Sequence, residues 1–479
     1  MWLFGCFLLT DCNKDAILID NTRGSLIMLP LRIKQKRAFW PTLVFVVTNL
    51  VCLFIALLLL LLDIDPHSVF GKRCFSDFLE TMAYAVSGDP YRGIPPLCSN
   101  YPPLPILLVY PFSFFCRGTV EAYLRGDIAL EYAYKNVDFL CAYLLYYVLS
   151  LCFLGFAAYK LAEKYSDQKW NLTVALLFCG PVLYCFGRGN VLFPAIAFTF
   201  LFFTYYDNKS RALREIAVLF LALAAAFKLY PAVFALLYIK EKRTLDFFKT
   251  VIYTAFLVFV PLCFFQGSYG TTVKLFIKGV VGFNNATDRY LHYSNVSFDF
   301  LLTAIALACE KLFHKNIYFG LDIVSSVIHG GLLLVTIVLS FLLRGKKEQW
   351  GRYITLLSCL CLFFTKVSYG YNLLYFFVPF LCFRQERMTY TRAHRIVSGC
   401  AYFLLFFPAF FLFKFFFLQM VAALYLLFDA AIGLIRHERK KKRFDKSGMN
   451  GCRNEKSCKK DISFEPNNTL KNQTDEECL

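Results

Sequence analysis

Residues 139–159 read FLCAYLLYYVLSLCFLGFAAY, and none of their side chains is charged. A hydrocarbon layer about 30 Å thick is crossed by a helix of about 20 apolar residues. Lys160, Lys164 and Lys169 follow directly, and clustered basic residues at the end of a span indicate its cytosolic side. The stretch therefore predicts a membrane-spanning helix whose carboxyl end faces the cytosol.

Further apolar runs lie on both sides of this helix. The first, Phe39–Leu62, follows the basic segment Arg32–Arg37, which predicts a first span with a cytosolic amino end. The other runs predict spans at 172–186, 191–205, 213–227, 231–239, 251–265, 317–343, 353–364, 372–383, 397–413 and 415–435. The sequence thus predicts an all-α, polytopic integral membrane protein with about twelve transmembrane helices.

Composition agrees with this fold class. Of the 479 residues, 58% are hydrophobic, and the formal net charge is +18. The basic residues gather at the ends of predicted spans, as in Lys240–Arg243 and Arg344–Lys347. Positive-inside topology explains this charge, so a nucleic-acid partner is not predicted.

The order of spans and polar segments predicts three regions. Residues 1–38 form a cytosolic amino-terminal segment, 39–436 the transmembrane domain, and 437–479 a basic and polar disordered cytosolic tail. Two polar segments lie outside, at 63–137 and 266–316. Within the first, Leu104–Phe115 is short and contains two prolines, which favours a helix lying in the membrane interface. Whether Cys74 and Cys98 form a disulfide there is left open by spacing alone.

Charged residues recur on the predicted external side. The first external loop contributes Asp77, Glu80 and Asp89. A buried charge at membrane depth costs a few kcal/mol unless it has a partner or snorkels to the surface. Snorkelling explains Lys228 as well as a bound anion does. Arg188 is harder to explain in that way, because it stands between two glycines and a guanidinium binds phosphate with two parallel hydrogen bonds.

The order of short motifs resembles the GT-C superfamily of membrane glycosyltransferases. Within it, the chain resembles family 87 and, more distantly, the enzymes that add the first mannose to glycosylphosphatidylinositol precursors. The resemblance spans Asp77 to Phe383 and rests on these motifs: Asp77-Phe78, Gly88-Asp89-Pro90-Tyr91, Tyr101-Pro102-Pro103-Leu104, Gly187-Arg188-Gly189-Asn190, Lys228-Leu229-Tyr230-Pro231, Tyr293-Ser294-Asn295-Val296-Ser297 and Lys366 through Asn372, with Pro379.

This resemblance implies an inverting transfer of a mannose-like hexose from a polyprenyl-phosphate donor to a lipid or glycan acceptor. An acidic residue of the first external loop acts as base in such a reaction, and Asp77 occupies that position. Arg188, Lys228 and Lys366 are the expected phosphate-binding cations. The candidates for substrate binding are Glu80, Asp89, Tyr91, Tyr101, Asn190, Arg289, His292 and Tyr369. No cofactor is expected, and the six scattered histidines lack the spacing of a metal site.

One departure from the mannosyltransferase pattern concerns a paired acidic motif. The only such pair, Asp63-Ile64-Asp65, lies at the end of the first span, where it is either a solvated helix end or a second acidic site. A carrier or flippase of lipid-linked saccharides is the main alternative function, and a noncatalytic membrane subunit is a third. The long acidic first loop favours the enzyme. A bacterial plasma membrane is the favoured location, with the endoplasmic reticulum expected for a eukaryotic chain.

Overall fold

The structure is a computed structural model, and the described residues are almost all helical. It describes residues 18–19, 26–27, 43, 45–51, 54, 75–92, 99–129, 135–284, 295–313, 321–345, 349–363, 367–386, 390–408 and 417–436. Contacts divide the chain into Met1–Ala430 and Ala431–Leu479. The described part of the second unit is the end of the helix Phe417–Arg436. Two-residue strands β1 (Leu18–Ile19) and β2 (Leu26–Ile27) pair antiparallel.

The helix predicted at 139–159 is confirmed as α6, which spans Val137–Tyr165. It packs on α9 (Phe193–Tyr205), which in turn packs on α10 (Arg211–Phe227). Between α6 and α9 the chain forms α7 (Lys169–Leu177) and α8 (Gly180–Arg188). A break at Phe178 and Cys179 separates these two helices within the single run predicted at 172–186, and Pro181 follows it at the start of α8.

Further helices continue the bundle. They are η3 (Tyr230–Ala235), α11 (Leu236–Lys240), α12 (Thr244–Phe259), η4 (Val260–Phe264), α15 (Leu321–Leu342), α16 (Trp350–Phe363), η6 (Gly370–Phe376), α17 (Phe377–Glu386) and α18 (Arg392–Phe406). The segment predicted as external at 266–316 contains two further helices, α13 (Tyr269–Asn284) and α14 (Phe298–Phe313). Charged residues such as Lys274, Lys278 and Asp299 interrupt the apolar runs of these two helices, so neither stands out as a span in the sequence.

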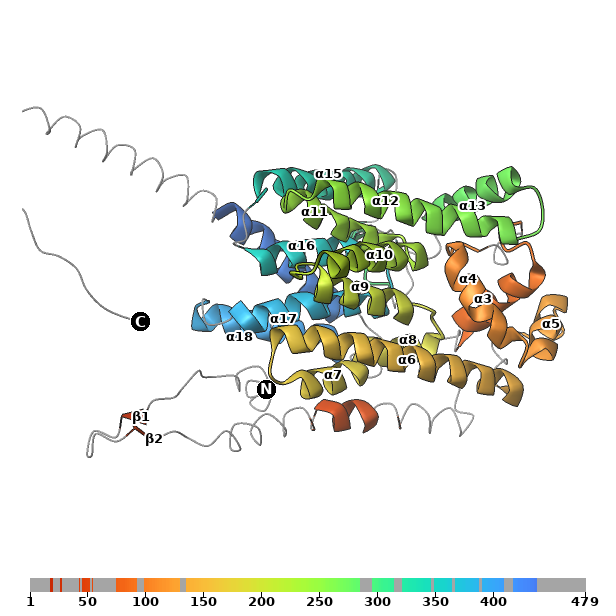
Figure 1. The fold of residues 1–479 in the computed structure, drawn as a ribbon, viewed down its shortest axis with the longest axis horizontal. Coiled ribbons are helices and arrows are strands. Elements are labelled where there is room, and N and C mark those ends of the chain that lie inside the picture. Colours follow the sequence, from red (N-terminus) through yellow and green to blue (C-terminus); the bar gives the residue numbers. More distant parts are fainter. Residues whose placement is uncertain are drawn as a thin grey trace, which may run out of the picture. The chain divides into compact units, whose positions relative to one another are not determined.

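The first loop folds into three helices at one end of the bundle, α3 (Ser76–Ser87), α4 (Pro103–Ser113) and α5 (Arg117–Arg125) (Figure 1). The axes of α4 and α5 differ by 117°. The helix predicted at 104–115 corresponds to α4, which packs on α3, and α5 follows it as a second helix. The loop is therefore a packed cap rather than an extended linker.

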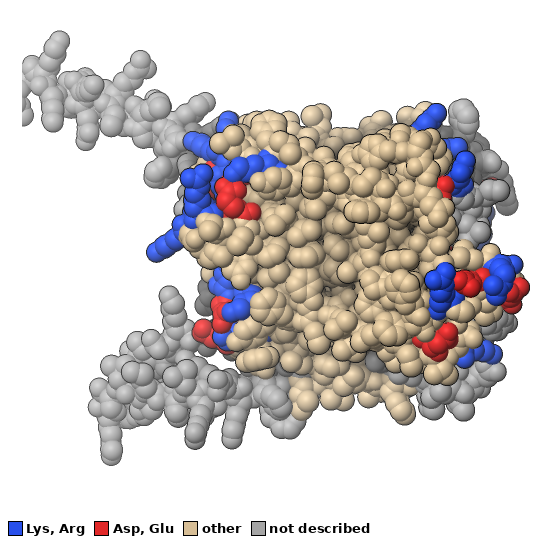
Figure 2. All heavy atoms as spheres, turned by 45° about the vertical axis from the view of Figure 1, so that its right-hand side comes forward, with Lys and Arg blue, Asp and Glu red and all other residues tan. Residues whose placement is uncertain are grey.

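Five described helices are long and apolar enough to cross a membrane, or six if the bent pair α4–α5 forms one span. The predicted number of about twelve is therefore not confirmed. Several of the other predicted spans are shorter apolar helices, such as α9, α16 and the pair η3–α11. Figure 2 shows a face on which charged side chains lie near both ends and a broad uncharged band separates them, as expected for a bundle surrounded by lipid.

The basic turns predicted to be cytosolic meet at one end of the bundle. Lys164 pairs with Asp207, and Arg243 donates to the Tyr206 carbonyl at 2.7 Å. The Gly345 amide donates to the Lys240 carbonyl at 2.6 Å. The cap formed by α3, α4 and α5 lies at the opposite end (Figure 1). The turns that carry the basic residues thus lie at one end of the fold, and the helices of the first loop lie at the other.

Candidate active site

Asp77 lies in the first turn of α3, directly after an unusual helix start. Phe75 caps the helix with φ 55°, a left-handed conformation that is uncommon for a bulky residue. Its amide donates to the Gly187 carbonyl at 2.9 Å, and its ring packs 4.7 Å from Tyr143 and 5.5 Å from Phe186. These contacts hold the strained turn in place. They also fix the start of α3 against the end of α8.

Gly189 makes this close approach possible. Its φ is +70°, and a Cβ atom there would stand 2.9 Å from the backbone of Phe75. Because the obstacle is backbone, no side-chain rotation would relieve it, and the glycine is required on both counts. The Gly-Arg-Gly-Asn motif can therefore lie directly against the start of α3.

Two residues of that motif bind the Asp77 carboxylate. The Arg188 Nη2 atom lies 2.8 Å from Asp77 Oδ1, and the Asn190 Nδ2 atom donates to Asp77 Oδ2 at 2.6 Å. The Asp77 side chain is 8% exposed and that of Arg188 5%. Removing one partner of such a buried pair costs about 3–5 kcal/mol, because the other charge is left uncompensated. Asp77 and Arg188 are 111 positions apart in the sequence. The sequence predicts that both face one cavity, and the structure brings them into contact.

Two tyrosine hydroxyls join the same group. Asn190 Nδ2 lies 3.0 Å from the Tyr101 hydroxyl and 3.1 Å from the Tyr371 hydroxyl. An amide nitrogen has two hydrogens, so these two hydroxyls and the Asp77 carboxylate share them. Burial raises the pKa of Tyr101 well above its usual range, which keeps its hydroxyl protonated. The Asp77 carboxylate thus has neutral hydrogen-bonding groups on its Oδ2 side and the charged Arg188 on its Oδ1 side.

Two buried polar atoms of the group have no hydrogen-bond partner among the described residues. They are Arg188 Nε and Asn190 Oδ1. Buried donors and acceptors are almost always paired in proteins, so each exception calls for an explanation. One is a donor and the other an acceptor, and both belong to side chains that hold Asp77. A polar ligand beside Asp77 would satisfy both.

Lys228 supplies a second cation. It follows α10 in the connection to η3, and its Nζ atom lies 4.1 Å from the centre of the Tyr101 ring. No carboxylate of the described part lies within 4.0 Å of this Nζ atom. Burial lowers the pKa of Lys228 to about 8, and the nearby Asp77 carboxylate partly opposes that shift. A half-buried lysine whose ammonium faces an aromatic ring is well suited to an anionic ligand.

The motif that ends at Asn372 contributes further residues to the site, from η6 and from the segment before it. The Tyr369 ring lies 5.2 Å from the Arg188 guanidinium. Tyr369 also forms an isolated antiparallel bridge with Asn295, and the Tyr230 hydroxyl donates to Asn372 Oδ1 at 2.6 Å. Three motifs that are far apart in the chain, at 228–231, 295–297 and 368–372, are thereby joined by hydrogen bonds around Asp77.

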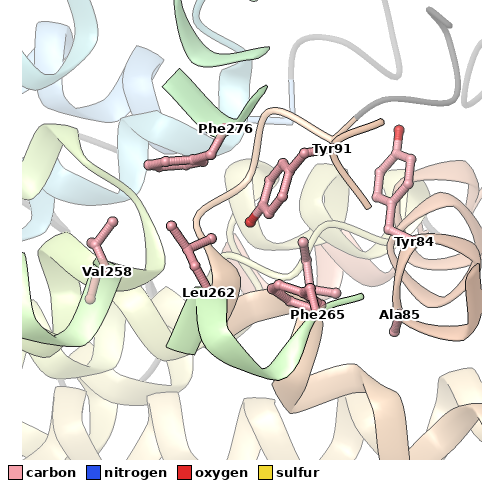
Figure 3. Packing of buried hydrophobic residues seen from close by; sticks show 9 residues of the cluster. Tyr84, Ala85, Tyr91, Val258, Leu262, Phe265 and Phe276 are labelled. Carbon is pink, nitrogen blue, oxygen red and sulfur yellow. The ribbon is translucent and has the colours of Figure 1, made fainter. Parts of the chain in front are cut away.

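Other predicted residues lie in different surroundings. Asp89 is 3.8 Å from the exposed Arg92. The Tyr91 ring packs in an aromatic cluster, 5.7 Å from Phe265 and 5.4 Å from Phe276 (Figure 3). Its hydroxyl donates to the Tyr101 carbonyl at 3.0 Å. Tyr91 thus helps to fix the position of the Tyr101 backbone.

Glu80 lies on α3, one turn after Asp77, and its charge contributes to the raised pKa of Tyr101. Several predictions fall outside the described residues: Asp63, Asp65, Cys74, Cys98, Arg289, His292, Lys366 and the tail 437–479. In the part of the chain that is described, no group of three or more His, Cys, Asp or Glu side chains is placed to hold a metal ion.

Sequence reasoning missed three residues of the site. Tyr371 contacts Asn190, while Tyr230 and Asn372 join two of the motifs. All three stand inside motifs that the sequence analysis quoted. Their roles depend on which side of a short 3-10 helix each residue occupies, and an apolar pattern does not predict that.

Comparison with known proteins places the chain in a family. The model of glycosyltransferase family 87 matches residues 100–365, which is more than half of the 479 residues. No curated protein matches the chain. The matched region includes Tyr101, Arg188, Asn190 and Lys228, whereas Asp77 precedes it and is joined to it by the contacts described above. With its apolar helices, the chain belongs to glycosyltransferase family 87 and is a membrane glycosyltransferase.

Proposed function

We propose that this protein transfers a mannose-like hexose from a polyprenyl-phosphate-linked donor to a hydroxyl of a lipid or glycan acceptor, with inversion at the sugar. The observation that carries the proposal is the buried group around Asp77. There a carboxylate, a guanidinium with an unused Nε atom and the Lys228 ammonium lie together. Such a reaction needs one proton acceptor and fixed positive charge beside it.

The two halves of the reaction divide between these groups. The bond between the sugar carbon and the phosphate oxygen breaks, and the phosphate departs as an anion. Arg188 Nε and Lys228 stabilise this developing charge, and Lys366 is the third expected cation. The acceptor oxygen attacks the opposite face of the same carbon and forms the new bond. Asp77 takes the proton that this hydroxyl loses.

Neutral groups around the carboxylate position the sugar and the acceptor. The Asn190 Oδ1 atom accepts a hydrogen bond from a hydroxyl of the substrate, which satisfies its buried lone pairs. Tyr101 and Tyr371 lie beside Asn190, and Tyr369 lies beside Arg188, so these are the aromatic side chains placed to contact a sugar ring. These contacts provide orientation, while the charged groups provide the chemistry.

We place the site on the non-cytosolic side, because the basic turns lie at the opposite end of the fold. The protein would then work across a bacterial plasma membrane, or facing the lumen in a eukaryotic endoplasmic reticulum. Single cysteines introduced into a chain freed of reactive cysteines test this. With an impermeant maleimide and intact cells, Ser268→Cys should be labelled, and Lys242→Cys should be labelled only after the membrane is opened. The reverse pattern would contradict the placement.

The proposal as a whole is tested by the donor that the purified protein accepts. In proteoliposomes we expect transfer from a polyprenyl-phosphate hexose and none from the corresponding nucleotide hexose. Movement of the lipid-linked sugar across the bilayer without any glycosidic product would instead indicate a flippase.

A further inference from the structure

An apolar cavity of about 520 Å³ is lined by residues of η3, α12 and α13. Its walls include Leu229, Ala232, Val251, Ala255 and Phe276. Volumes of this size hold ligands with tens of atoms. Leu229 is 39% exposed and Val251 49%, so the cavity is a groove that opens on the surface of the protein.

The lining carries very little polarity. Of its two threonines, Thr250 donates to the Asp246 carbonyl at 2.8 Å and is thereby satisfied within its own helix. The wall helix is part of Thr244–Phe264, a candidate span with a mean hydropathy of 1.9. Neighbouring side chains on its outer surface, Ile252 and Phe256, are 63% and 62% exposed. The groove therefore opens toward lipid, and the chemistry that fits it is a hydrocarbon chain.

One end of the groove reaches the candidate active site. Leu229 of its wall directly follows Lys228, and Phe276 belongs to both the groove and the aromatic cluster against which Tyr101 packs. Toward the other end, Phe247 precedes Phe259 by twelve residues of α12, so this wall is about 18 Å long. A chain lying in the groove would bring its polar head to Lys228 and the Tyr101 ring.

We infer that this groove binds the isoprenoid chain of the donor and thereby delivers its phosphate to Lys228. The inference rests on the function proposed above. The charge at the head of the groove favours the donor over the acceptor, because Lys228 matches a phosphate that sits at the end of an apolar chain. The occupant is thus a long, branched hydrocarbon with a single anionic head.

Filling the groove tests the inference. Ala255→Phe and Ala232→Phe place a ring in the cavity from two different walls, and Ile252→Phe adds a ring to the same helix at an exposed position that does not line it. Binding of undecaprenyl phosphate and of the short geranyl phosphate is measured on the purified full-length protein. Size-exclusion profiles in detergent first establish that each variant is folded.

We expect the two groove variants to bind undecaprenyl phosphate at least about tenfold more weakly than the wild type. Ile252→Phe should bind it normally, and geranyl phosphate should bind similarly to all four proteins. Unchanged undecaprenyl phosphate binding in both groove variants would overturn the inference. So would an equal loss for geranyl phosphate, because the damage would then lie at the phosphate site.

Three further outcomes separate the donor from the acceptor as occupant, and failure of the groove from failure of the proposed function. If the groove variants raise the KM for a lipid acceptor and leave undecaprenyl phosphate binding unchanged, the groove belongs to the acceptor and the assignment is wrong. If the wild type itself binds no undecaprenyl phosphate, the proposed donor class fails together with this inference. If the wild type and both groove variants all bind the donor normally, the assignment of the groove is wrong and the proposed function still stands.

Discussion

Asp77→Asn is expected to lower sugar transfer by roughly 100-fold or more, because removal of a positioned general base costs a factor of that order. The amide preserves the size of the side chain and part of its hydrogen bonding, so donor binding should fall much less than turnover. Measuring the transfer rate and lipid-phosphate binding on the same preparation separates the two effects. Asp127→Asn is the matched control, because Asp127 follows α5 in the same loop, is 58% exposed and pairs with the exposed Arg125.

Loss of the Asp77 charge also leaves Arg188 without its buried partner, so stability is measured alongside activity. Asp77→Glu keeps the charge and moves the carboxylate by one methylene. It should fold normally and retain only a small residual rate, because geometry limits proton transfer. The assignment would fail if Asp77→Asn transferred sugar at the wild-type rate while combined Asp63→Asn and Asp65→Asn abolished it.

Arg188→Ala should reduce turnover by about 10²- to 10³-fold, the range found when one preorganised hydrogen-bond donor to a developing anion is removed. It also leaves the Asp77 carboxylate without its buried ion-pair partner, which lowers the stability of the fold. Arg188→Lys keeps the positive charge but loses the planar group that reaches Asp77 Oδ1 while leaving Nε toward a ligand. We therefore expect this variant to fold well and still bind the lipid phosphate weakly.

The double variant Asp77→Asn/Arg188→Gln separates stability from catalysis. It removes both buried charges, so it should melt at a higher temperature than either single charge-removing variant. It should nevertheless remain inactive, because base and cation are both gone. Unchanged turnover and lipid-phosphate binding in Arg188→Ala, or activity in the double variant, would show that this pair has only a structural role.

The helices could be predicted from sequence where hydrophobicity alone determines them. Residues 139–159 form one uninterrupted apolar run, and α6 covers it. The sequence predicts an external segment at 266–316 and does not predict the helices α13 and α14 that the structure has there. Helix–helix packing, which single-sequence periodicity does not report, stabilises such elements.

The candidate site could be predicted as a set of charged residues but not as a network. Arg188 was recognised because a cation between two glycines is unusual at a span end. The contact between Gly189 and the left-handed Phe75 follows from backbone geometry across the fold. Tyr371 was missed because a tyrosine in an aromatic-rich membrane sequence does not stand out until its hydroxyl is seen beside Asn190.

The anomeric configuration of the product tests the central claim most directly. Wild-type protein in proteoliposomes is given a polyprenyl-phosphate hexose of known configuration, isotopically labelled at the anomeric carbon, together with an acceptor. NMR of the product then reports the new glycosidic bond. The proposed direct attack, with Asp77 as base and the phosphate leaving from the opposite face, predicts a single inverted product. A product of retained configuration, or one that forms only from a nucleotide hexose, would contradict it.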